Sequence, residues 1–302
     1  MAEPLQIFDR PLIDTRRRRA LRELPSGADF LLRTAVDDLS ERLTAVSRSF
    51  DVVVDLATPL PHLADRLIKD AQAGSVIRLD RLPETHPAVV GDPEFLPFAS
   101  ESLDLVVSAL ALQWVSDLPG VLAQVRRALK PDGLLFSNML GGETLHELRE
   151  CLTLAEAEIT GGAAPRVAPF AELRQIGALL QRAGFALPVV DQDRLTVRYD
   201  DALALMRDLR AMGATNALIE RSRRPLVREV LFRAATLYAE RFADADGRVR
   251  ATFDIVSLSG WAPHESQQKP LRPGSAQARL ADVLGTAEKS AGEKVGPGTT
   301  KP

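Results

Sequence analysis

The sequence predicts an α/β fold built on a mostly parallel sheet, and three neighbouring segments carry that prediction. Residues 103–112 are short and almost continuously apolar, which is typical of a strand covered on both faces. Residues 118–129 repeat apolar side chains at helical spacing, so one stripe of this helix is expected to be buried. Residues 134–139 then resume as a strand. Strand, helix and strand in this order predict a right-handed βαβ crossover.

The segment Lys130-Pro131-Asp132-Gly133 separates this helix from the strand that follows it. Proline disfavours helical geometry at the residue before it, so the helix is expected to end near Lys130. Gly133 can adopt a positive φ, which the turn after a helix often requires. The sequence therefore predicts a tight turn at residues 130–133.

The other elements follow from the same periodicities, with short β-branched runs interpreted as strands and apolar stripes as helices. Thr58 is expected to cap a helix that starts at Pro59 and that Gly74 closes. Further strands are expected at residues 50–56, 75–80, 186–190, 195–199 and 251–258. Further helices are expected at residues 28–48, 145–160, 173–183 and, in two pieces, 201–242.

Changes in composition divide the chain into three parts. Residues 1–48 are expected to form a basic arm and a helix, and residues 49–265 the sheet domain. A helical insertion at residues 201–246 interrupts that domain before its final strand. From residue 266 the chain is rich in Pro, Gly, Ser and Lys, which predicts a mostly disordered tail with at most a short helix near residues 278–284.

The bulk composition excludes several classes of protein. The chain has 302 residues, 45% of them hydrophobic, and a net charge of -3, so no global attraction to nucleic acid is expected. No apolar run approaches the roughly 20 residues that span a bilayer, although peripheral membrane contact stays open. A single cysteine, Cys151, allows no internal disulfide and indicates a reducing compartment. We therefore expect a cytoplasmic protein, and the composition does not fix its oligomeric state.

Two groups of arginines have two interpretations each. Arg16–Arg19 form a run near the start, and Arg221, Arg223, Arg224 and Arg228 gather in the helical insertion. The first run is either a solvated helix face or a dock for a partner, and such an arm could lie over a ligand cleft. The second is either a solvated face or a recognition surface for an acidic partner.

Four segments in the middle of the chain resemble the second half of a class I S-adenosylmethionine-dependent methyltransferase domain. They are the Glu-Phe-Leu-Pro-Phe segment at 94–98, the strand at 103–106, Trp114 and the turn at 129–133. The resemblance implies a Rossmann-like sheet, mostly parallel with an antiparallel last strand, with helices on both faces. It also implies S-adenosylmethionine as cofactor.

Further segments narrow the resemblance. Residues 7–10, 141–145 and 260–266 make the chain similar to the family of mitochondrial complex I assembly factors that are regarded as arginine hydroxylases. The malonyl-carrier-protein methyltransferases of biotin synthesis are more distantly similar. The assembly-factor resemblance implies a protein partner, such as a subunit of respiratory complex I.

The methyltransferase resemblance also implies a set of cofactor-binding residues. These are Asp55, Ala57, Thr58, Asp80, Arg81, Asp92, Glu94, Ser108 and Trp114. Asp80 ends the second strand, where a carboxylate can accept both ribose hydroxyls, and Asp92 would face the adenine amino group. Each aspartate could instead be a turn residue, and Trp114 could be a core residue.

The turn after the first strand departs from the methyltransferase pattern. Residues 56–61 contain no glycine, which would let the backbone approach the methionine part of a cofactor. Pro59 and Pro61 also remove two amide donors. This leaves three functions open: a methyltransferase of unknown acceptor, an arginine hydroxylase or assembly factor for complex I, and a cofactor-free binding module. No catalytic residue can be named, and the spacing of the four histidines predicts no metal site.

Overall fold

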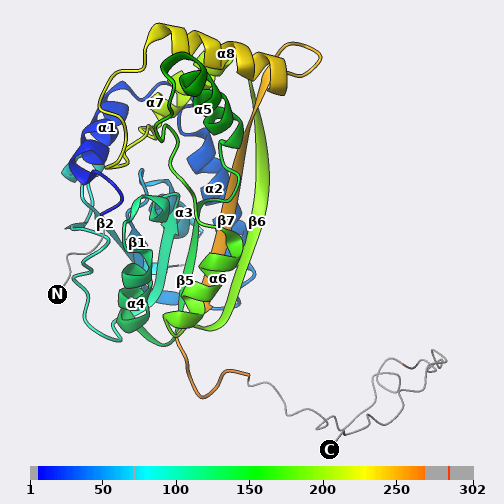
Figure 1. The fold of residues 1–302 in the computed structure, drawn as a ribbon. Coiled ribbons are helices and arrows are strands. Elements are labelled where there is room, and N and C mark those ends of the chain that lie inside the picture. Colours follow the sequence, from blue (N-terminus) through cyan, green and yellow to red (C-terminus); the bar gives the residue numbers. More distant parts are fainter. Residues whose placement is uncertain (1–5, 71–72, 269–284, 286–302) are drawn as a thin grey trace, which may run out of the picture. The chain divides into compact units, whose positions relative to one another are not determined.

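The computed structural model describes residues 6–70, 73–268 and 285 of the chain. The chain up to His264 forms one compact unit. Its described residues contain a seven-stranded sheet with the order β3-β2-β1-β4-β5-β7-β6 (Figure 1). The first five strands in this order are parallel, whereas β7 is antiparallel to both of its neighbours. The predicted α/β class, with an antiparallel last strand, is confirmed.

The strands and helices have the following bounds. The strands are β1 (Phe50–Leu56), β2 (Ala73–Asp80), β3 (Val89–Val90), β4 (Leu103–Ala109), β5 (Leu129–Gly141), β6 (Ala186–Tyr199) and β7 (Val249–Trp261). The helices are α1 (Arg10–Glu23), α2 (Phe30–Thr44), α3 (His62–Lys69), α4 (Leu118–Ala128), α5 (His146–Thr160), α6 (Leu173–Arg182), α7 (Ala202–Ala211) and α8 (Arg228–Phe242).

Helices cover both faces of the sheet, because its central strands are apolar on both sides (Figure 1). On one face, α4 and α6 pack on side chains such as Val54 and Val106. On the other face, α2 and α3 pack on Val53 and Val107. Successive residues of β1 and β4 thus point to opposite cores, as the alternation of a strand requires.

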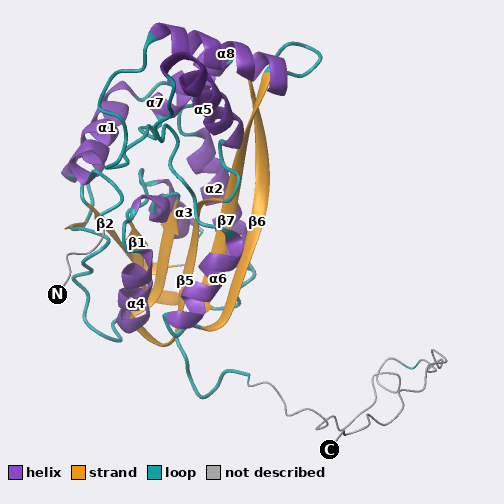
Figure 2. Ribbon diagram, in the orientation of Figure 1, coloured by secondary structure: helices purple, strands orange, loops and turns teal. Residues whose placement is uncertain are grey.

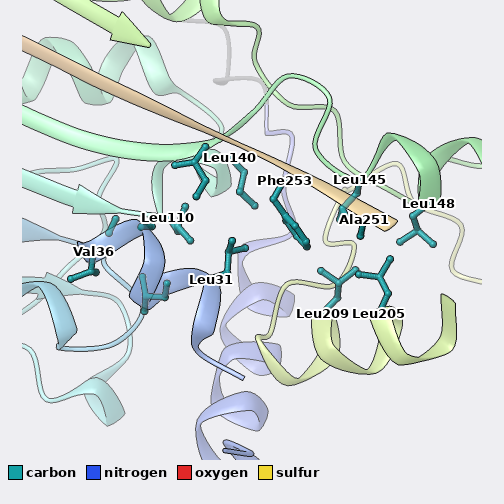
Figure 3. Packing of buried hydrophobic residues seen from close by; sticks show 14 of the residues in the cluster. Leu31, Val36, Leu110, Leu140, Leu145, Leu148, Leu205, Leu209, Ala251 and Phe253 are labelled. Carbon is teal, nitrogen blue, oxygen red and sulfur yellow. The ribbon is translucent and has the colours of Figure 1, made fainter. Parts of the chain in front are cut away.

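The second of these cores continues into the helical insertion. Figure 3 shows Leu31 of α2, Leu140 of β5, Phe253 of β7 and Leu205 of α7 among the side chains that fill it. The insertion helices α7 and α8 lie between β6 and β7 in the sequence. The ribbon formed by these two strands extends past the rest of the sheet and reaches α8 (Figure 2).

Three elements differ from the sequence expectation. Helix α3 begins at His62 instead of Pro59, because Thr58 is buried and uses its hydroxyl to accept a hydrogen bond from the Ala109 amide. Strand β2 begins at Ala73, so Gly74 lies within it. The two strands expected at residues 186–199 are one strand, β6, paired with β7 along nearly its whole length.

The tight turn predicted at residues 130–133 also differs from the expectation, because these residues lie within β5. Asp132, not Gly133, adopts the positive φ, of 62°. Gly133 is needed instead for a close approach, since a Cβ there would lie 2.9 Å from the Lys130 carbonyl oxygen. Strand β5 begins at Leu129 directly after α4, and its pairing with β4 shifts register between Leu129 and Leu134.

Two expectations concern the C-terminal part and the membrane. The predicted disordered tail and its short helix at 278–284 fall almost entirely outside the described residues. Among the helices that the structure describes, none is both long and apolar enough to cross a bilayer.

Leu105→Ala should test the central packing. Leu105 is fully buried in β4 between its neighbours β1 and β5, so its truncation should lower the free energy of unfolding by about 2–5 kcal/mol. Urea unfolding measures this loss. Ile68→Ala in α3 is the control, because Ile68 is 60% exposed and its truncation should change the stability by less than about 0.5 kcal/mol. Equal effects of the two substitutions would contradict the described core.

Candidate functional site

A cavity of about 160 Å³ lies where the carboxyl ends of β1, β2 and β4 meet. Ligands of parallel α/β sheets bind at this edge. Helix α1 forms one wall of the cavity through side chains such as Arg10, Ile13 and Arg17. Much of the remaining lining is apolar and includes Leu31, Leu32, Leu60, Leu110 and Leu140.

The structure places the sequence-predicted cofactor residues in two groups. One group lines the cavity and consists of Ala57, Asp80, Arg81, Asp92, Glu94 and Trp114. The other group, Asp55, Thr58 and Ser108, is buried beside the cavity and does not line it. Ser108, for example, donates its hydroxyl proton to the Leu56 carbonyl oxygen at 2.7 Å, which ties β4 to β1.

Asp80 is held by donors on both of its carboxylate oxygens. The Arg17 guanidinium reaches them as a fork, with Nη1 at 2.8 Å from Oδ1 and Nη2 at 2.7 Å from Oδ2. The Arg81 amide donates to Oδ1 at 2.6 Å, and the Thr85 hydroxyl donates to Oδ2 at 3.0 Å. The Leu82 amide adds a third contact to Oδ1, at 3.4 Å. With the side chain only 1% exposed, each oxygen already has at least two partners, which fills its acceptor capacity.

The acids around Asp92 are paired in the same way. Arg10 binds both Asp92, at 2.6 Å, and Glu94. Arg81 bridges Asp92, at 3.1 Å, and Asp14 of α1, at 2.8 Å. Three arginines, Arg10, Arg17 and Arg81, therefore pair with the four acids at this rim of the cavity, and two of the three belong to α1.

Helix α1 is held in place mainly by charge. Ala20 is its only described side chain that is fully buried, whereas Arg10, Asp14, Arg17 and Arg18 each form an ion pair with another part of the chain. The expected arm over the ligand cleft fits this geometry, and Arg17 is not part of a solvated face. Arg10, which lies outside the run of arginines, was not anticipated.

The glycine-free turn after β1 is held by a buried arginine. Ala57 adopts a positive φ of 60°, the conformation that a glycine would take there. Arg78 of β2 donates to the Thr58 carbonyl at 3.1 Å, to the Thr85 carbonyl at 2.6 Å and to Asp55 at 3.2 Å. It thereby joins the ends of β1 and β2. Burial raises the pKa of Asp55 to about 6 even with Arg78 beside it.

Trp114 covers another side of the cavity. Its ring packs edge-on against Phe8, with the two ring centroids 5.6 Å apart. Ala168 and Leu218 complete this small apolar cluster. The ring therefore lines the cavity and at the same time joins the segment before α1 to distant loops, while remaining only partly buried.

The start of α5 is tied to β7 by hydrogen bonds that lie away from the cavity. Glu147 is buried and accepts hydrogen bonds from the amide and hydroxyl of Thr252. Asp254 of β7 is likewise buried and accepts a fork of hydrogen bonds from Arg194, at 2.7 and 2.9 Å. None of these side chains lines the cavity. Within the part of the chain that is described, no three His, Cys, Asp or Glu side chains could hold a metal ion.

This arrangement does not fit S-adenosylmethionine. The ribose hydroxyls of the cofactor would need acceptor capacity on Asp80, which Arg17, the Arg81 amide and the Thr85 hydroxyl already occupy. Pro59 and Pro61 also offer no amide proton at the turn that would face its methionine part. Ala57 is the one feature of the turn that suits a cofactor, because its backbone conformation is glycine-like.

Comparison with known proteins gives the family. A methyltransferase domain matches residues 52–137. The zebrafish (Danio rerio) protein named "Arginine-hydroxylase NDUFAF5, mitochondrial" is 38% identical over 92% of this chain and 90% of its own length. The human protein of that name is also 38% identical, over 92% of this chain and 84% of its own length. The chain belongs to the NDUFAF5 family.

The relationship extends to methyltransferases. A malonyl-[acyl-carrier protein] O-methyltransferase of Methylovorus is 34% identical over 84% of the chain and 91% of its own length. Among solved structures, the YcgJ protein of Bacillus aligns with a TM-score of 0.53 at 15% identity, over 76% of this chain and 99% of that one. This likeness shows the fold alone. The NDUFAF5 family thus has a methyltransferase-like fold, as the sequence resemblance implied.

The family corrects the expected location. The NDUFAF5 proteins of zebrafish, mouse and human are all named as mitochondrial, so the prediction of a cytoplasmic protein is wrong. The composition indicated only a reducing compartment. A single cysteine and a balanced charge do not distinguish one such compartment from another.

Asp55 should make the stability depend on pH. The folded protein retains the Asp55 proton up to about pH 6, whereas an unfolded aspartate releases it near 3.8. The folded state therefore binds more protons in this window, and its stability should fall as the pH rises from about 4 to 6, by up to about 3 kcal/mol. Asp55→Asn has no proton to release, so its urea-unfolding curves at pH 4, 5 and 6 should lack this component. Parallel pH profiles for the two proteins would contradict the assignment.

Proposed function

We propose that the protein acts on an arginine side chain of a partner protein, which is the activity printed in the name of its NDUFAF5 relatives. Identity of 38% over 92% of the chain supports this proposal. The partner that the sequence resemblance implies is a subunit of respiratory complex I. We propose such a subunit as the first substrate to test.

The observation that carries the proposal is the guanidinium already seated in the cavity. Arg17 engages Asp80 through two parallel hydrogen bonds, the geometry in which a carboxylate recognises arginine. The cavity lining contains more carboxylates than arginines even without Asp29, which pairs with Arg33 and His62: Asp14, Asp80, Asp92 and Glu94 against Arg10, Arg17 and Arg81. This excess favours a further cationic side chain. An arginine of the partner would exchange with Arg17, so the Asp80 carboxylate would remain paired throughout.

Co-expression with a complex I subunit should test this function. We expect the intact mass of that subunit to increase by one oxygen atom, and fragmentation to place the oxygen on an arginine. Asp80→Asn should lower the modified fraction at least about tenfold, because a neutral amide replaces the charged acceptor of the guanidinium.

Asp200→Asn is the matched control, since that side chain is 87% exposed and lies outside the cavity. It should leave the modified fraction unchanged. An increase by one methylene unit would identify methyl transfer in place of hydroxylation. An unmodified subunit, bound or unbound, would contradict the proposed activity.

S-adenosylmethionine binding is the second candidate, and with it methyl transfer to an unknown acceptor. It is supported by the methyltransferase domain at residues 52–137 and by the position of Asp80, Asp92 and Ala57 around one cavity. The Arg17–Asp80 ion pair opposes it while α1 is in place. The candidate therefore requires that α1 first leaves the cavity.

Calorimetric titration of Arg17→Gln with S-adenosylmethionine should show whether α1 must leave the cavity before the cofactor binds. The substitution frees acceptors on Asp80, so the variant should bind the cofactor at least about tenfold more tightly than the unsubstituted protein, in which only the open fraction binds. Adding Asp80→Asn should abolish the gain. Arg22→Gln, at an exposed position of α1, is the control. Equal affinities would show that α1 does not compete, and absence of binding to either protein would favour a cofactor-free binding module.

A further inference from the structure

A second hollow, of about 400 Å³, lies beside the N-terminal part of α1. Arginines dominate its lining, which consists of Leu12, Arg16, Arg166, Asn216, Arg221, Ser222 and Arg223. The four arginines come from α1, from the loop before α6 and from the loop between α7 and α8. No carboxylate is among the lining residues. Three distant segments thus bring guanidinium groups to one place.

Two of these arginines are anchored from behind. The Arg221 guanidinium donates to Asp9 at 2.9 Å and to the Leu218 carbonyl at 2.7 Å, which leaves its Nε without a described partner. Arg166 forms an ion pair with Glu156 through Nε and Nη2, which leaves Nη1 without a described partner. The anchors fix the positions of both groups, and each retains a donor for a ligand.

The other two have no carboxylate partner in the described part of the chain. Arg16 uses only Nη1, which donates to the carbonyls of Thr215 and Asn216, so its Nε and Nη2 retain their protons for another acceptor. Arg223 is exposed and forms neither an ion pair nor a side-chain hydrogen bond among the described residues. Burial and the nearby charges of Arg221 and Arg19 lower the pKa of Arg16, and the charge of Asp9 opposes this shift.

We propose that this hollow binds a multivalent oxyanion, of the phosphate or polycarboxylate class. Such a group presents several acceptors at once, and four guanidinium groups converge on the hollow with donors to spare. Arg16 and Arg223 form no ion pair among the described residues and interact with Asp9 only at longer range, so a bound anion supplies direct counter-charge. Arg16 and Arg223 bind it most strongly, because neither has a carboxylate to share.

Only two of the four arginines that gather in the helical insertion line the hollow. Arg221 and Arg223 line the hollow, whereas Arg224 and Arg228 do not. Arg224 is exposed and adjacent to Arg223, so it is a matched control for a charge that contributes only at long range. Long-range attraction is screened by salt, whereas contacts within the hollow are screened much less.

Titration calorimetry of the full chain at constant ionic strength tests the site, with pyrophosphate in one arm and citrate in the other. We expect saturable binding at one site, with the tighter ligand identifying the class of oxyanion. Arg16→Gln and Arg223→Gln should each weaken the binding at least about tenfold, while Arg224→Gln changes it less than about twofold.

Arg223→Gln keeps the test valid if Arg16→Gln disturbs folding, because Arg223 has no structural contact to lose among the described residues. Circular dichroism and the melting temperature of each variant check the fold. Binding that all three substitutions weaken equally would indicate diffuse attraction and overturn the site. Failure of the unsubstituted protein to bind either anion would overturn it as well.

Discussion

The buried guanidinium of Arg78 is the interaction on which the cavity depends. It joins the carbonyl after β1, the carbonyl of the turn after β2 and the carboxylate of Asp55. An arginine in a nearly water-free position would be costly if it were unpaired, and here three acceptors from two strand ends compensate it. The positions of Ala57 and Asp80, and through Asp80 that of α1, follow from this junction.

Ion pairs close the cavity, although α1 also contributes apolar side chains such as Ile13 and Leu21 to its lining. A helix that buries a single alanine contributes little hydrophobic free energy, so α1 remains in place chiefly because its arginines meet the acids of the strand ends. The methyltransferase resemblance implies that a nucleoside cofactor would need the same acids. Each of them already has an internal arginine partner. Under the proposed functions, an arginine of a partner and a nucleoside cofactor would compete for Asp80.

Most of the fold could be predicted from the sequence, because apolar periodicity encodes the elements that bury a face. The β4–α4–β5 crossover and the antiparallel β7 are where they were expected. The start of α3 was not, since a capping role for Thr58 is locally plausible and only the neighbouring β4 strand removes it. The extent of β6 likewise depends on pairing with β7, which no local pattern records.

The site was predictable only in part. Strand ends are visible in sequence, so Asp80 and Asp92 could be placed at one edge, and both line the cavity. Their partners lie far away along the chain: Arg17 is separated from Asp80 by 63 positions and Arg10 from Asp92 by 82. Ion pairs between residues so far apart in the chain produce no periodic pattern in the sequence. Asp55 and Ser108 also lie near strand ends, yet their side chains are buried and do not line the cavity.

The long β6–β7 ribbon connects the helical insertion to a sheet whose acid-lined edge is built by other strands. The helices that it carries are attached to the far end of a hairpin, and the acid-lined edge is built by other strands of the sheet (Figure 2). Exposed residues of α8 can therefore diverge during evolution with little disturbance to the strand ends, whereas the end of α7 lines the cavity itself. A fold of this kind can acquire a new protein partner through changes in the exposed residues of α8, while the strand ends that line the cavity remain unchanged.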